Sequence, residues 1–155
     1  MSDSEISALR KAEDFRWENV ERRLYKDEGA APFKDVSRQT LFSDPHMAGE
    51  LRYFEVEANG YSTLERHEHM HAVMILRGEA DVLVGAAVYR AKPHDLITIP
   101  PWTWHQFRAT KGDKLGFLCL VNAERDRPQL PTAQELAAMR AEPQVARFLD
   151  GEDTE

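Results

Sequence analysis

The sequence has very little cysteine and no long apolar segment. Cys119 is the only cysteine in 155 residues, so no disulfide can form within the chain, which fits a reducing cytoplasm. No apolar run approaches the roughly 18 residues of a membrane span. The N-terminus lacks the basic start and the apolar stretch of a secretory signal. We therefore expect a cytoplasmic protein with no membrane partner.

Excess positive charge is also missing. Lys and Arg total 20 against 27 Asp and Glu, a formal charge of -7, and no basic cluster interrupts this balance. This pattern argues against nucleic acid as a partner. Hydrophobic residues make up 42% of the chain and charged residues 30%, which is typical of a globular protein. We predict a single domain over residues 1–155 that folds on its own core.

The middle of the chain, residues 36–122, consists of short β-like runs separated by turn residues. Many short strands with closely spaced turn signals predict a sandwich or a barrel. Helix-length patterns between the strands are absent, which argues against a parallel α/β sheet. The turn signals are Asn59-Gly60, Gly78, Gly85, Pro93, Pro100-Pro101 and Gly112.

Both ends of the chain predict helices. In the N-terminal segment, residues 1–30, one stripe at helical spacing carries Ile6, Leu9, Trp17, Val20 and Leu24. In the C-terminal segment, residues 130–150, Thr132 and Glu135 have the spacing of a capping box. Pro143 should end that helix, and a last short turn should stop at Gly151.

A histidine cluster points to a metal. Glu65, His67, His69 and His71 alternate along the chain, so on a strand their side chains can share one face. Burying these polar groups without partners would cost several kcal/mol. A divalent metal removes that cost, because imidazole nitrogen and carboxylate oxygen are its ligands. A solvated, histidine-rich edge strand is the alternative, but the flanking apolar residues argue against it.

These segments resemble the cupin family. Gly60 and Gly78 bracket the histidine cluster as glycines bracket the first cupin motif, and the residues from Pro100 to His105 correspond to the second. The resemblance covers residues 45–122. It implies an all-β fold, the cupin double-stranded β-helix or jelly-roll barrel, here with flanking N- and C-terminal α-helices.

By position, the resemblance implies Glu65, His67, His71 and His105 as the metal shell. Glu65 stands where the family has its first histidine, and His71 stands where the family has its glutamate. The ligand set of three histidines and one carboxylate is unchanged. His69 is additional, and it either replaces Glu65 or acts as a base beside the metal. The cofactor is one divalent transition metal, with Mn, Fe, Ni, Co and Zn left open.

The second motif also departs from the family at one position. Trp102 stands where cupins have a glycine. We therefore expect the turn before His105 to avoid a positive φ, which side chains other than glycine rarely adopt.

Two further residue types are candidates for the site. Alternation places Cys119 with Phe117 and Val121 on one strand face, where the thiol is either a reactive group near the metal or a small buried apolar residue. An inward arginine would bind a carboxylate or phosphate, although most strand arginines face solvent. The candidates are Arg52, Arg77, Arg90 and Arg108. The stretch Arg125-Asp126-Arg127 predicts a solvated turn or a helix-anchoring ion pair.

Three functions fit these features. Whole segments are similar to bacterial cupins of methionine salvage, the methylthioxylulose-phosphate methylsulfurylases, which transfer a methylthio group from a sugar phosphate to a thiol. That resemblance implies a small-molecule substrate, His69 or Glu65 as proton shuttle, and Cys119 as an acceptor of the sulfur fragment. The alternatives are a metal-dependent dioxygenase or isomerase on a small enolisable acid, and a non-catalytic metabolite-binding module. We expect a homodimer.

Overall fold

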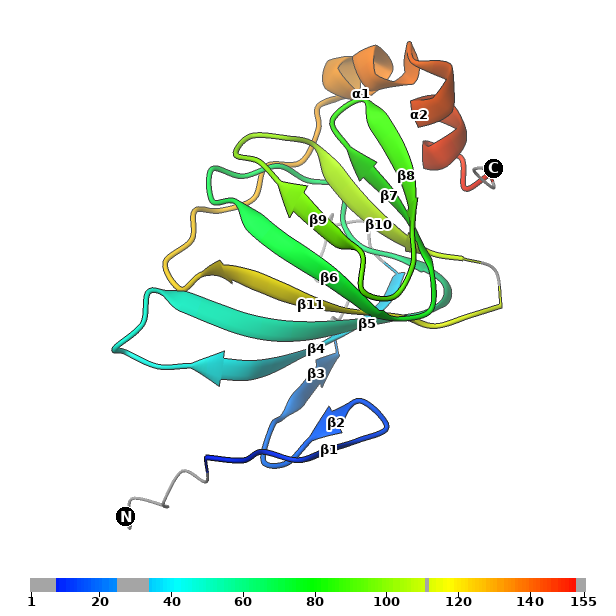
Figure 1. Cartoon of the computed structure of the whole chain (residues 1–155). Coiled ribbons are helices and arrows are strands. Elements are labelled where there is room, and N and C mark those ends of the chain that lie inside the picture. The colour runs from blue at the N-terminus through cyan, green and yellow to red at the C-terminus, as the bar shows by residue number, and fades with distance from the viewer. Residues whose placement is uncertain (1–7, 25–33, 111, 153–155) are drawn as a thin grey trace.

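The protein is a curled antiparallel sheet with two short helices at the C-terminal end (Figure 1). The computed structural model describes residues 8–24, 34–110 and 112–152. The strands are β1 (Ala12–Glu13), β2 (Arg16–Trp17), β3 (Arg22–Leu24), β4 (Lys34–Ser43), β5 (Gly49–Tyr61), β6 (His71–Arg77), β7 (Ala80–Val84), β8 (Ala87–Ala91), β9 (Leu96–Ile99), β10 (His105–Ala109) and β11 (Leu115–Asn122). The helices are α1 (Ala133–Arg140) and α2 (Pro143–Leu149).

Strands β3 to β11 form one nine-stranded sheet. Its central path runs β8-β7-β10-β5-β11-β6-β9, and β4 pairs with both β5 and β3. The 13-residue strand β5 is long enough to pair with β11 and β4 and to reach β10 at Tyr61. This long strand lets the sheet curl around a core that includes Val73, Ile75 and Phe117. The predicted all-β class is confirmed.

The C-terminal helices also agree with the prediction. Thr132 caps α1 in a capping box with Glu135, and Pro143 starts α2 in the first turn, where proline is tolerated. Val145 and Phe148 of α2 are buried in a second apolar cluster against the barrel. Gly151 follows α2 with a positive φ of 76°. No helix of the described residues is long and apolar enough to span a membrane.

The predicted N-terminal helix is wrong over residues 8–24, which form β1, β2 and β3 instead. Phe15 and Trp17 pack on the outer side of Tyr53, with ring centroids 5.7 and 5.0 Å away. The Gln39 side chain accepts the Trp17 N–H at 3.2 Å and donates to the Phe15 carbonyl at 2.8 Å. These tertiary contacts outweigh the helical spacing of the apolar residues. The remaining predicted positions, 1–7 and 25–30, lie outside the described residues.

Candidate metal centre

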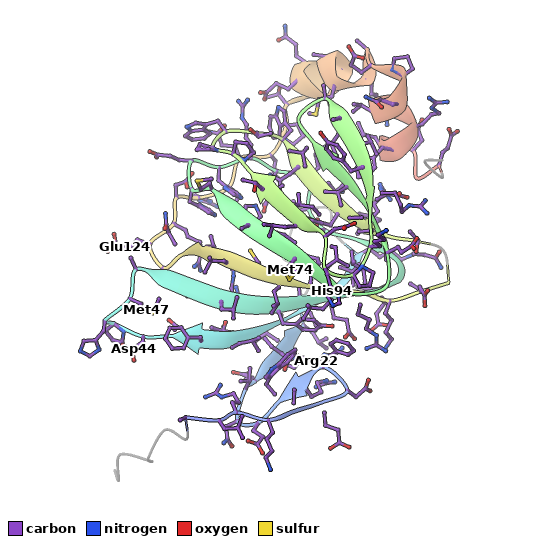
Figure 2. The ribbon with its side chains drawn as sticks, viewed as in Figure 1. Arg22, Asp44, Met47, Met74, His94 and Glu124 are labelled. Atoms are coloured by element: carbon purple, nitrogen blue, oxygen red, sulfur yellow. The ribbon has the colours of Figure 1, made fainter. Side chains whose placement is uncertain are left out.

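The two segments singled out in the sequence lie next to each other. Glu65 and His105 exchange backbone hydrogen bonds of 3.2 and 3.0 Å, and the Trp102 N–H donates to the His67 carbonyl at 2.7 Å. His71 and His105 begin β6 and β10 respectively, so both imidazoles start from strands of the barrel. The exposed histidines lie elsewhere, His94 in the β8–β9 turn and His46 in the β4–β5 hairpin beside the labelled Asp44 (Figure 2).

Three histidines converge on one point. Each of His67, His71 and His105 offers a ring nitrogen, and these atoms lie within 4.8 Å of one another. The Nδ1 atoms of His67 and His105 lie 2.6 and 2.9 Å from the carbonyls of His69 and Thr103. A carbonyl can only accept, so both Nδ1 atoms carry the proton and both Nε2 atoms keep a lone pair.

The electrostatics of this group fit a metal cation. Burial lowers the pKa of His71 to about 2 and that of His105 to about 4, and it lowers the pKa of His67 as well. The imidazoles are therefore neutral near pH 7. The Nε2 atoms of His71 and His105 lie only 3.3 Å apart, so without a metal His71 would have to carry its proton on Nε2 to donate to His105. Nitrogen ligands bound at right angles, about 2.1 Å from a metal, have nearly this spacing, about 3 Å.

Glu65 lines the same cavity as the three histidines. Burial raises the pKa of its carboxyl to about 7, partly offset by the charge of Arg52. Three of the four predicted ligands thus form one group, whereas the role of Glu65 as the fourth stays a prediction.

His69 has a carboxylate partner that the sequence analysis missed. Its ring stacks on His67 with centroids 3.7 Å apart, and its Nδ1 lies 2.7 Å from the Asp126 carboxylate. Asp126 also accepts the backbone N–H groups of Glu68 and His69 at 2.8 and 3.0 Å. These bonds, led by that from Glu68, hold the pKa of Asp126 well below its usual range. The two residues are 57 positions apart, so no local pattern predicts their contact. Instead of a solvated turn or a helix-anchoring ion pair, Asp126 makes an ion pair with the His69 ring.

Cys119 points into the barrel, as strand alternation predicted. The residue is 1% exposed, whereas Leu120 beside it is 53% exposed. Its Sγ lies 3.2 Å from His71 Nδ1 and 3.8 Å from an Arg52 nitrogen. Burial raises the pKa of the thiol, and Arg52 acts in the opposite direction. The thiol therefore contacts one of the three converging histidines directly.

These side chains surround a cavity of about 260 Å³, slightly below the range of roughly 300 to 1,000 Å³ that is typical of ligand pockets. Its wall includes the three histidines, His69, Cys119, Phe54, Phe107 and Phe117. Of the strand arginines, Arg52 lines it. The others are engaged elsewhere, Arg77 with Glu55, Arg90 with Asp81, and Arg108 with Tyr61 and the Leu149 carbonyl.

The turn before His105 differs from the expectation. Trp102 adopts a φ of 57°, the left-handed conformation that we expected this residue to avoid. Its N–H bond to His67 and the adjacent Pro100-Pro101 pair hold the backbone there. The turn thus keeps the glycine-like geometry of the motif at a cost of about 1 kcal/mol.

Known proteins show the same architecture. Residues 52–121 match a family model described as a cupin domain. A crystal structure of a cupin 2 conserved barrel domain protein from Rhodopseudomonas palustris is 57% identical, with a TM-score of 0.87, over 91% of this chain and 98% of that one. The chain belongs to the cupin family. A cupin-2 domain structure from Rhodospirillum rubrum is 56% identical, with a TM-score of 0.86, over 92% of this cupin and 96% of that chain.

Two relatives of this cupin carry names of activities. A Rhodospirillum rubrum protein named 1-methylthio-D-xylulose 5-phosphate methylsulfurylase is 59% identical over 137 residues, 88% of each chain. A Bradyrhizobium protein named 5-nitrosalicylic acid 1,2-dioxygenase is 40% identical over 60 residues, which is 39% of this cupin and 28% of that protein. The first similarity spans most of both proteins, and the second covers a part of each.

Proposed function

We propose that this cupin is a metal-dependent enzyme that moves the methylthio group of a 1-methylthio-ketose 5-phosphate to a thiol. The observation that carries the proposal is the 3.2 Å contact between Cys119 Sγ and His71 Nδ1 in the wall of the cavity. Cys119, the sulfur nucleophile of this proposal, thus contacts one of the candidate metal ligands. The 59% identical methylsulfurylase supports the same substrate class.

The reaction balances with a thiol as the co-reactant. A thiolate sulfur attacks the methylthio sulfur and forms an S–S bond, while the C–S bond of the substrate breaks. The electron pair of that bond passes to C1 of the ketose, which takes up a proton and becomes a methyl group. The thiol is thereby oxidised to a methyl disulfide, and the carbon is reduced by two electrons. A divalent metal, when bound by His67, His71 and His105, supplies Lewis-acid polarisation of the substrate carbonyl.

The chain supplies the sulfur and the proton. Cys119 is the proposed first acceptor of the methylthio group, and a small external thiol then releases it by thiol–disulfide exchange. Asp126 accepts a hydrogen bond from the Nδ1–H of His69. The Nε2 atom of His69 is then free to exchange a proton with the substrate. Glu65, whose pKa lies near 7, is the alternative proton carrier.

The test is direct. Metal-loaded protein is mixed with 1-methylthio-xylulose 5-phosphate and dithiothreitol, and the products are followed by NMR. We expect a 1-deoxyketose phosphate and methanethiol in equal amounts, because the second thiol of dithiothreitol attacks the methyl disulfide first formed, closes the cyclic disulfide and releases methanethiol. Without dithiothreitol, one equivalent of product should form, and mass spectrometry should find the methylthio group on Cys119. No cleavage with any divalent transition metal would contradict the proposal.

The dioxygenase or isomerase alternative is not favoured, because the dioxygenase match covers only 39% of this cupin and 28% of that protein. An iron-loaded sample that consumes oxygen with a small enolisable or aromatic acid would favour that reaction over methylthio transfer. The homodimer stays a prediction, which analytical ultracentrifugation would test.

A further inference from the structure

We infer that Arg52 and Arg125 form the anion-binding end of the cavity and hold the phosphate of the substrate. This inference rests on the proposed function for the identity of the substrate. Its physical basis, a buried guanidinium lacking a full set of partners, is independent of the reaction. Both arginines line the same cavity as the three histidines.

Arg52 is a buried charge with spare hydrogen-bonding capacity. Only 9% of the residue is exposed, and its Nε has no hydrogen-bond partner among the described residues. Its contacts are a weak bond to Cys119 Sγ at 3.8 Å, an ion pair with Glu50 at 3.9 Å, and the Phe54 ring at 5.0 Å. A buried guanidinium so incompletely paired carries a desolvation cost that a bound anion would offset.

Arg125 adds a second positive charge. Its side chain is 27% exposed and lies 3.6 Å from the carboxylate of Glu50, the same group that pairs with Arg52. One carboxylate therefore serves two guanidinium groups. The Asp126 carboxylate, which also lines the cavity, is already engaged by His69 and the backbone of residues 68 and 69. Arg125 also donates to the carbonyl of Asn122 at 3.0 Å, and this bond anchors it after β11.

The position of this pair matches a substrate with a reactive carbon at one end and a phosphate at the other. Arg52 and His71 contact the same sulfur atom, so the arginine lies one side chain away from the candidate metal ligands. A guanidinium fork suits phosphate oxygens, which accept two parallel hydrogen bonds. The two arginines are therefore specificity-determining residues for a phosphorylated substrate.

The experiment compares a phosphorylated substrate with its phosphate-free analogue. For metal-loaded wild type we expect kcat/KM to be at least about a hundredfold higher for 1-methylthio-xylulose 5-phosphate than for 1-methylthio-xylulose. Arg52→Met should lower kcat/KM for both substrates, because Arg52 also contacts Cys119 Sγ. It should lower kcat/KM for the phosphorylated substrate by a further factor of about 10 to 100, so the ratio between the two substrates falls by this factor. The matched control is Arg22→Met in β3 (Figure 2), because Arg22 also lies 3.9 Å from a glutamate, Glu57, but does not line the cavity. The control should keep the wild-type ratio.

A binding measurement separates this inference from the proposed function. Calorimetric titration with unreactive xylulose 5-phosphate and with xylulose needs no turnover. Suppose that the protein cleaves no substrate but binds xylulose 5-phosphate more tightly than xylulose, and that Arg52→Met loses this preference. That result would support the inference and contradict the proposed function. If wild type transfers the methylthio group and Arg52→Met loses the same factor in kcat/KM on both substrates, the inference is overturned. Arg52 would then act on the Cys119 thiol and not on the phosphate. If Arg52→Met does not fold, Arg125→Met at the partly exposed rim decides by the same ratio, and an unchanged ratio would overturn the inference.

Discussion

The Nδ1 atom of His71 lies 3.2 Å from the Sγ atom of Cys119. One imidazole thus connects the candidate metal site to the only cysteine of the chain. If Nε2 of His71 binds the metal, its Nδ1 carries the proton and donates to the sulfur. Metal occupancy and the state of the thiol are then coupled through a single ring.

The ligand set can be tested by metal analysis. His67→Ala, His71→Ala and His105→Ala should each lose most of the bound metal, because each removes one of the converging nitrogen donors. His69→Ala should keep its metal but lose activity. His46→Ala is the control, since His46 is exposed in a distant hairpin. An empty His69→Ala together with a full Glu65→Ala would show that His69, and not Glu65, is the fourth ligand.

Replacing Cys119 should separate chemistry from packing. Cys119→Ser should abolish turnover while changing the free energy of unfolding by no more than about 1 kcal/mol, because the hydroxyl occupies nearly the same volume beside Arg52 and His71. Turnover and thermal unfolding are measured on the same preparation. Normal turnover by the serine variant would rule out the sulfur-acceptor role.

Asp126 is predicted to position His69. Asp126→Ala should lower kcat by about 10- to 100-fold with a full metal content, because it frees the His69 ring and the backbone of the 68–69 turn. Asp126→Glu should restore part of the rate if the carboxylate contact to the ring is what matters. Asp44→Ala is the matched control, since Asp44 makes the same backbone and ring contacts to His46, both at 2.8 Å, away from the cavity. Equal losses in the two variants would point to a general loss of stability.

Metal removal should destabilise the protein without unfolding it. A metal at a hundredfold excess over its dissociation constant adds about 2.7 kcal/mol to the free energy of unfolding. For a chain of this length that is about 5 to 11 °C in Tm. Calorimetry of the chelated sample should show a lower but cooperative transition, with β-type circular dichroism preserved at room temperature. Unfolding on chelation would instead identify a structural metal.

A glycine in β11 tests the packing outside the site. A side-chain carbon at Gly116 would overlap the hydroxyl of Tyr53, which donates to Glu55 at 3.0 Å. Gly116→Ala should therefore lower the free energy of unfolding by about 1 to 3 kcal/mol. Gly49→Ala is the control, because the nearest atom to its added carbon is 3.7 Å away, an ordinary contact. Similar denaturation midpoints for the two variants would contradict this account of the Tyr53 contact.

The sequence by itself determined the features that depend on nearby residues. Alternation placed Cys119 on the interior face of its strand, and the residues from Thr132 to Glu135 carried the whole capping box. The sequence also singled out His67 and His71 as candidate ligands, because their spacing and their residue type both point to a metal.

Contacts between distant segments were decided only by the tertiary structure. Trp17 lies in a strand and not in a helix, because the ring of Tyr53 and the side-chain amide of Gln39 hold it there. Asp126 meets His69 across 57 residues, and Arg52 meets Cys119 across 67. No local pattern encodes such pairs, since strand order and the curl of the sheet set which side chains meet inside the barrel.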